Sequence, residues 1–377
     1  MKTKYYLDIL NCIITGKSLS EGTVGNISLQ ELFWFARLNK MLPLISEYLD
    51  KWQPATQEEQ NLVADWKTMA MQQVFGEHRK LHLVKQLLAE AEKRKIQLIF
   101  FKGYLLAGLY KNFALRNSSD TDIFVKEEAL QEAVLMLKEL QYRPVSELDT
   151  KNVYTFVYEE NGAVVHKIEL HTSLYDDAAG AELEQLNNLQ LIAEEHIISV
   201  ACCGMKLKTL NHTEHFLYQV VHMVKHFCCH GFPSRYLLDM VLFIRQYESE
   251  INWRKINEAV ESLGYQEFYT QLVSVLIHCF GLSKGLLPEK DLKTVQETEE
   301  LLRDILAFGA RSYGEKLSGA FFYFEAYVEK TERKLGKRLE KITFDGTTVP
   351  DTVVSPQYQQ EEQLQKRIGL LRSMELI

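Results

Sequence analysis

The chain contains 377 residues, with a hydrophobic fraction of 46%, a charged fraction of 25% and a formal net charge of −8. This length allows two or three packed units, and the composition is ordinary for a soluble globular protein. The acidic balance excludes a general attraction to polyanions, so a long nucleic acid is not expected as a partner. The most basic run, at residues 333–341, is interpreted as the solvated face of a helix.

Cysteine usage and hydropathy indicate a cytoplasmic protein. The six cysteines include two adjacent pairs, at 202–203 and 228–229, and their irregular spacing does not form a disulfide framework. No stretch approaches the roughly 18 consecutive apolar residues that a membrane-spanning helix requires. Residues 5–14 are largely apolar, but Asp8 and Asn11 interrupt them and no signal-peptide cleavage site follows. We expect no membrane partner, and the composition leaves the oligomeric state open.

Residues 1–95 are predicted to form an N-terminal helical region. Ser28 and Glu31 have the spacing of a capping box, which marks the start of a helix. Apolar residues recur at helical spacing from about residue 57 to residue 95, and this pattern indicates one long helix. We interpret the region as a collar of helices that packs on a sheet.

The next segment combines a glycine turn with a strand that carries two acids. An apolar run at residues 98–101 ends at Lys102 and Gly103, and a short helical pattern follows. The segment 120–125 then alternates as a strand does, which places Asp120 and Asp122 on one face. Two neighbouring carboxylates repel each other unless a cation lies between them. Oxygen ligands of this kind suit Mg²⁺.

A predicted hairpin supplies a third acid. Residues 127–140 have the periodicity of a helix, and residues 153–158 and 164–170 alternate as two strands around an Asn-Gly turn. Glu169 and His171 share the face opposite the apolar residues of the second strand. If this strand pairs with the 120–125 strand, Glu169 joins the two aspartates.

After Ser173 the chain is predicted to be mostly helical. Helical patterns cover most of 212–246, with a break at 231–234, and recur at 252–262 and 295–308. Residues 342–356 are strand-like or irregular. The predicted fold class is α+β, with a small mixed β-sheet wrapped by N-terminal and C-terminal helices.

The order of these elements and motifs resembles the uncharacterised bacterial nucleotidyltransferases of the DNA polymerase beta-like superfamily. The pattern is Lys-Gly, then Arg116, then Asp-x-Asp, then Glu-Leu-His, and the likeness covers roughly residues 30–250 in outline. It implies a catalytic core at 96–200, of the nucleotidyltransferase fold, and a C-terminal helical domain at 201–377. It also implies that Asp120, Asp122 and Glu169 are catalytic and bind two Mg²⁺ ions, with Mn²⁺ as an alternative.

The resemblance also implies a nucleotide site. Gly103 would let phosphates approach the backbone closely. Gly103 is followed by Tyr104, where the superfamily usually has Gly-Gly or Gly-Ser, so Ser118 or Ser119 is the candidate for the usual serine contact. Two basic residues, Lys102 and Arg116, either bind the triphosphate or pair with nearby acids.

Four further residues have two or more interpretations. His171 either orients an acceptor or phosphate, or is a surface histidine at a strand end. In the family resembled, a later helical segment carries two histidines and an aspartate, which correspond here to His222, His226 and Asp239. The histidines line the nucleotide cleft, lie in the core, or bind zinc with the nearby Cys228, Cys229 and His230. Asp239 is either on the substrate side or in an intrahelical ion pair with Arg235.

The function implied is an Mg²⁺-dependent nucleotidyltransferase. It would move a nucleoside monophosphate from an NTP to a small molecule or a protein side chain and release pyrophosphate. Two alternatives stay open, namely an inactive nucleotide-binding or scaffold module of the same fold and a purely helical interaction protein. No short motif reveals which NTP or which acceptor is used.

Overall fold

The computed structural model describes residues 2–146, 152–175, 183–229, 231–306 and 369–376. It divides the chain into two compact units. The sheet unit contains Lys2–Gln219 and Arg235–Ile256, and the helical unit contains Val220–Ser234 and Asn257–Ile377. The predicted segments at 333–341 and 342–356 lie outside the described residues.

The N-terminal region of the sheet unit is helical, as predicted. Its helices are α1 (Thr3–Thr15), α2 (Glu21–Val24), α3 (Leu29–Leu38), α4 (Leu42–Ser46) and the 38-residue α5 (Gln57–Arg94). Capping boxes begin α3 at Ser28 and α5 at Thr56, because each cap side chain and the third-residue glutamate satisfy each other's backbone amides. The predicted capping box and the predicted long helix are both confirmed.

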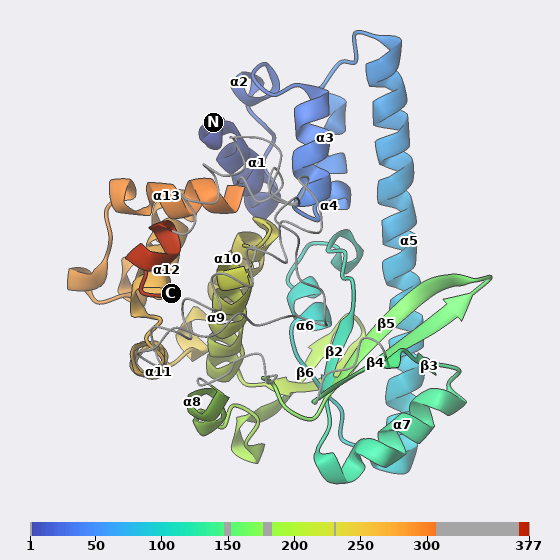
Figure 1. Cartoon of the computed structure of the whole chain (residues 1–377). Helices are drawn as coiled ribbons and strands as arrows, with labels where there is room; N and C mark the ends of the chain where they lie inside the picture. The colour runs from blue at the N-terminus through green and yellow to red at the C-terminus, as the bar shows by residue number, and fades with distance from the viewer. Residues whose placement is uncertain (1, 147–151, 176–182, 230, 307–368, 377) are drawn as a thin grey trace, which may run out of the picture. The chain divides into compact units, whose positions relative to one another are not determined.

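A seven-stranded mixed sheet forms the centre of this unit (Figure 1). Its strands are β1 (Ile99–Phe100), β2 (Thr121–Phe124), β3 (Arg143–Pro144), β4 (Val153–Glu160), β5 (Ala163–His171), β6 (Ile197–Cys202) and β7 (Met205–Leu210). Their spatial order is β3-β4-β5-β2-β1-β7-β6. The pairs β2–β5 and β1–β7 are parallel, and the others are antiparallel. The α+β class is confirmed.

One face of the sheet packs in the apolar core. Ile123 of β2 and Ile168 and Leu170 of β5 belong to the same buried cluster as residues of α5 and of α7 (Leu130–Glu139). Because side chains alternate along a strand, Asp122 and Glu169 project from the opposite face. Burial of the apolar set therefore decides where the acids point.

The prediction of a mostly helical chain after Ser173 is wrong for the β6–β7 hairpin. Met205 and Leu207 are buried in β7 while Lys206 and Lys208 are exposed, which is the alternation of a half-buried strand. β7 also pairs with β1, so the sheet continues to Leu210, ten residues beyond the predicted core boundary at residue 200.

The remaining helices agree with the predicted helical segments. They are α6 (Gly103–Ala107), α8 (Leu183–Asn188), α9 (His212–Cys229), α10 (Arg235–Tyr247), α11 (Trp253–Ser262), α12 (Gln266–Phe280) and α13 (Val295–Leu306). None of the described helices has both the length and the apolar character that crossing a bilayer requires.

Candidate active site

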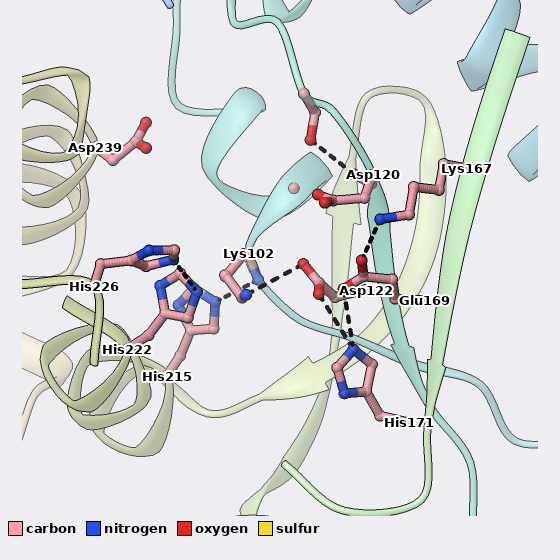
Figure 2. A network of polar contacts seen from close by, with 12 residues as sticks. Lys102, Asp120, Asp122, Lys167, Glu169, His171, His215, His222, His226 and Asp239 are labelled. Atoms are coloured by element: carbon pink, nitrogen blue, oxygen red, sulfur yellow. Dashed lines mark hydrogen bonds and ion pairs between the residues drawn. The ribbon is translucent and has the colours of Figure 1, made fainter. Parts of the chain in front are cut away.

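Two carboxylates and an imidazole come together on the polar face of the sheet. Asp122 of β2 and Glu169 of β5 are direct partners in the parallel register, and His171 follows two residues later on the same face. One ligand atom from each of the three side chains lies within 4.8 Å of the other two (Figure 2). The predicted strand pairing is thus confirmed, and His171 belongs to the group that it forms.

Each carboxylate divides its two oxygens between a lysine and this histidine. Lys102 Nζ lies 3.4 Å from Asp122 Oδ2, and Lys167 Nζ contacts Glu169 Oε1. His171 Nε2 lies 3.3 Å from Asp122 Oδ1 and 3.9 Å from Glu169 Oε2. The lysines therefore hold the outer oxygens, and the inner oxygens converge on the imidazole (Figure 2).

The charges of the site stabilise one another. Burial alone would raise the pKa of Asp122, but the nearby Lys102 and His171 hold the pKa of that carboxyl well below its usual range. Burial likewise opposes the charged form of Lys102, yet the charge of Asp122 raises the pKa of the ammonium above its ordinary value. Both groups are therefore ionised at neutral pH.

The turn at Lys102 and Gly103 has an unusual backbone. Lys102 has φ 59° and ψ −127°, and Gly103 has φ 29°. His215 Nε2 accepts a hydrogen bond of 3.1 Å from the Lys102 amide, and Arg116 Nη1 donates one of 3.2 Å to the Gly103 carbonyl. A Cβ placed on Gly103 would meet no atom within 4 Å, so the space beside it is open.

Two residues of α9 that the sequence interpretation missed hold Lys102 in place. His215 binds its amide, and the ring centroid of Tyr218 lies 5.4 Å from its ammonium nitrogen. His215 is fully buried, and burial lowers the pKa of its imidazole to about 3, so that it stays neutral and able to accept. One sequence signal could have identified His215: it lies seven residues before His222, about two helical turns, so the two histidines share one face of the helix.

Arg116 is held by a buried aspartate. Its Nε and Nη2 donate to the two oxygens of Asp239 at 2.7 and 2.8 Å, and the Tyr110 hydroxyl donates to Oδ1 at 2.7 Å. The sequence left open whether Arg116 binds the triphosphate or pairs with an acid, and the structure shows the pairing with an acid. Asp239 therefore bonds to a residue far away in sequence, and Arg235, its expected partner, donates to the carbonyl of Asn117.

Asp120 and the two serines lie in the loop that leads into β2. Asp120 precedes the strand and is not part of the group formed by Asp122, Glu169 and His171. The Ser118 hydroxyl donates to the Asp120 carbonyl at 2.8 Å, and the Ser118 amide donates to Glu77 Oε1 at 2.9 Å. Ser119 is exposed between them. The predicted roles of Asp120 and both serines stay predictions.

His222 and His226 belong to the helical unit. Their Nε2 atoms lie 3.0 Å apart, so one imidazole donates to the other. Among the side chains that the structure describes, the only group of three or more metal-ligating residues is the one at Asp122, so no described third ligand joins these histidines. The side chains of Cys229 and His230, which the zinc alternative also invoked, lie outside the described set.

The sequence profile of the uncharacterised nucleotidyltransferases matches residues 26–281. The chain belongs to this family. The match covers more than half of the chain and includes the acids, both lysines and the Arg116–Asp239 pair. No curated protein sequence matches it significantly.

Solved nucleotidyltransferase structures show weak likenesses. A crystal structure of ANT(2")-Ia with adenylyl-2"-tobramycin is 14% identical, covers 49% of this chain and 97% of its own, and has a TM-score of 0.36. A nucleotidyltransferase-like protein from Paracoccidioides brasiliensis is 14% identical, covers 52% of this chain and 90% of its own, and has a TM-score of 0.33. These scores are too low to assign a substrate.

Proposed function

We propose that this nucleotidyltransferase depends on a divalent metal ion and moves a nucleoside monophosphate from an NTP to a hydroxyl group of a small molecule or protein, with release of pyrophosphate. Family membership supports nucleotidyl transfer in general. The observation that carries the proposal is the convergence of Asp122, Glu169 and His171 on one face of the sheet.

The residues present fit a metal ion, either Mg²⁺ or Mn²⁺, and two ions are expected from the superfamily resembled. Asp122 and Glu169 would supply oxygen ligands, and Nε2 of the buried His171 faces their carboxylates at 3.3 and 3.9 Å. Asp120, which directly precedes β2 and lies two residues before Asp122, is proposed as a further acid of the site. When bound, the metal supplies positive charge to the triphosphate and favours the ionised acceptor.

The chain's own groups position the reactants. Lys102 brings a fixed positive charge to the triphosphate, and the open space at Gly103 admits phosphate oxygens. Ser118 and the exposed Ser119, which directly precede Asp120 in the chain, are the proposed hydroxyl contacts to the phosphates. The acceptor oxygen forms a bond to the α-phosphorus while the bond from that phosphorus to the bridging oxygen breaks, and pyrophosphate leaves. The acceptor proton passes to solvent as this bond forms, and Glu169 Oε2, the oxygen that Lys167 does not contact, would hold the metal ion.

Removal of a single carboxylate tests the proposal. The purified protein is incubated with each α-labelled NTP, Mg²⁺ or Mn²⁺ and cell extract, and both label transfer and pyrophosphate are measured. Asp122→Asn and Glu169→Gln should each lower turnover by roughly two orders of magnitude or more. Asp65→Asn, which changes an exposed aspartate of α5, is the matched control and should leave turnover unchanged.

Circular dichroism and thermal unfolding establish that each variant is folded. Full turnover in both active-site variants would contradict the assignment. Nucleotide binding without turnover across the extract fractions would instead favour the inactive nucleotide-binding module.

A further inference from the structure

His171 is a buried imidazole whose Nε2 faces two carboxylates. It is 8% exposed at the end of β5, and its ring meets that of Phe101 in a T-shaped arrangement, with ring centroids 5.1 Å apart. Nδ1 has no hydrogen-bond partner among the described residues, and Nε2 lies at ion-pair distance from Asp122 and Glu169. Two carboxylates and one imidazole nitrogen that converge in this way form a donor set for a cation.

The surroundings of Nε2 indicate what that ligand is. The nitrogen points at Asp122 Oδ1, 3.3 Å away, and at Glu169 Oε2, 3.9 Å away (Figure 2). Neighbouring ligand atoms that each lie about 2.1 Å from a shared ion are roughly 3 Å apart in octahedral geometry. The separation of Nε2 from Asp122 Oδ1 is close to this spacing, and one ligand atom from each of the three side chains lies within 4.8 Å of the other two, so side-chain adjustment would let them surround one cation.

Two lysines orient the carboxylates and contact only the oxygens that do not face His171. Lys102 contacts the Oδ2 atom of Asp122, and Lys167 contacts the Oε1 atom of Glu169. The other oxygen of each carboxylate is the one that faces the imidazole. The ligand set that results contains two oxygens and one nitrogen.

We propose that His171 is a metal ligand and that the site consequently binds Mn²⁺ more tightly than Mg²⁺. Mg²⁺ prefers oxygen ligands and retains its water shell, whereas imidazole suits transition-metal ions. The inference rests on the proposed function, because it identifies the metal and one ligand of the same site. It makes His171 a metal ligand, whereas the sequence predicted that it orients an acceptor or a phosphate, or that it lies on the surface.

Metal binding to the full-length protein without nucleotide tests the inference. The Mn²⁺ affinity is measured by the electron paramagnetic resonance signal of free Mn²⁺, and the Mg²⁺ affinity by competition. We expect Mn²⁺ to bind about tenfold more tightly than Mg²⁺, and His171→Ala to weaken Mn²⁺ binding by about tenfold with little effect on Mg²⁺. His82→Ala, which removes an exposed imidazole from α5, should change neither affinity.

Pulsed paramagnetic resonance gives a readout that does not depend on affinity. The wild-type complex with Mn²⁺ should show coupling to an imidazole ¹⁴N nucleus, and this coupling should be absent in His171→Ala. His171→Asp replaces the nitrogen with an oxygen ligand, so it should bind Mn²⁺ without the nitrogen coupling and with a smaller preference over Mg²⁺.

The outcomes separate this inference from the proposed function. Equal affinities for the two ions, bound Mn²⁺ without nitrogen coupling, or no Mn²⁺ binding at all would overturn the role of His171, whether or not the protein transfers nucleotides. Nitrogen coupling in a protein with no turnover on any NTP would support the ligand and contradict the proposed function.

Discussion

At the scale of single residues, the two lysines beside the acids set the charge that an incoming cation meets. Lys167 is about a quarter exposed and contacts Glu169 two residues along the same strand. Burial lowers the pKa of Lys167, but the contact with Glu169 and the charges of Asp120 and Asp122 raise it above its ordinary value. The ammonium is thus charged at neutral pH and opposes a divalent ion electrostatically.

Removing this charge should strengthen metal binding. We expect Lys167→Gln to lower the dissociation constant for Mn²⁺ several-fold at low ionic strength, a change on the order of 1 kcal/mol for a partly exposed charge. The gain should shrink as salt is added, because salt screens the lysine. Lys206→Gln, which removes an exposed lysine of β7, should have no effect. Weaker binding in Lys167→Gln would mean that Lys167 chiefly orients Glu169.

Residues that share a strand were predictable, and residues that meet through the tertiary fold were not. Strand alternation alone placed Asp122 and Glu169 on polar faces, because each lies between apolar neighbours. No local pattern links Arg116 to Asp239, and none links Lys102 to His215. These contacts depend on where α9 and α10 pack, which sequence periodicity does not encode.

At the scale of elements, α6 and the β6–β7 hairpin pack so closely that a side chain at one glycine position would force a neighbouring side chain to move. A Cβ on Gly108, the residue that ends α6, would lie 2.5 Å from Cys202 Sγ. The same thiol donates to the Tyr104 carbonyl at 2.9 Å. The hairpin therefore supports the short helix that follows the Lys102 turn.

Crowding this contact should destabilise the fold. We expect Gly108→Ala to lower the free energy of unfolding by about 1–3 kcal/mol, the usual cost of overpacking, measured by urea denaturation. Adding Cys202→Ala should recover part of the loss, because it removes the sulfur atom. Gly76→Ala is the control, since nothing lies within 4 Å of its Cβ position and alanine favours the interior of α5. Equal stability of Gly108→Ala and wild type would show that the hairpin shifts freely.

Long elements and the hairpin marked by an Asn-Gly turn were predictable, whereas the β6–β7 hairpin was not. α5 repeats its apolar pattern over many turns, and the β4–β5 hairpin has an Asn-Gly turn. β6 and β7 have six residues each and lie between segments with helical composition. Lys206 and Lys208 do alternate with apolar residues, as in a half-buried strand, but alternation over so few residues is a weak signal.

At the scale of the whole sheet unit, two buried neutral histidines link stability to pH. His166 contacts the Thr121 hydroxyl at 2.8 Å and the Tyr142 hydroxyl at 2.6 Å, on the core side of β5. Burial lowers the pKa of His166 and of His215 to about 3. Both imidazoles must gain protons when the protein unfolds in mild acid.

Acidification should therefore weaken the fold well above the range in which carboxylates titrate. Histidine in the unfolded chain has a pKa of about 6.5, so the unfolded state binds more protons than the folded state between pH 6.5 and 3. The free energy of unfolding should fall by about 2 kcal/mol per histidine between pH 7 and pH 5, with no contribution from these groups above pH 7. Urea denaturation at both values measures the loss, and His166→Gln should reduce it. A stability that does not change with pH would mean that both imidazoles are already charged in the folded state.

The register between β2 and β5 ties chemistry to folding. Ile168 and Leu170 enter the core while Glu169 and His171 lie on the opposite face of the sheet, because side chains alternate along one strand with a period of two residues. An insertion or deletion of one residue within β5 would exchange the two sets and place Glu169 and His171 in the apolar core. The requirement to fold therefore constrains the length of this strand, and evolution can remove these two side chains from their face only by substitution.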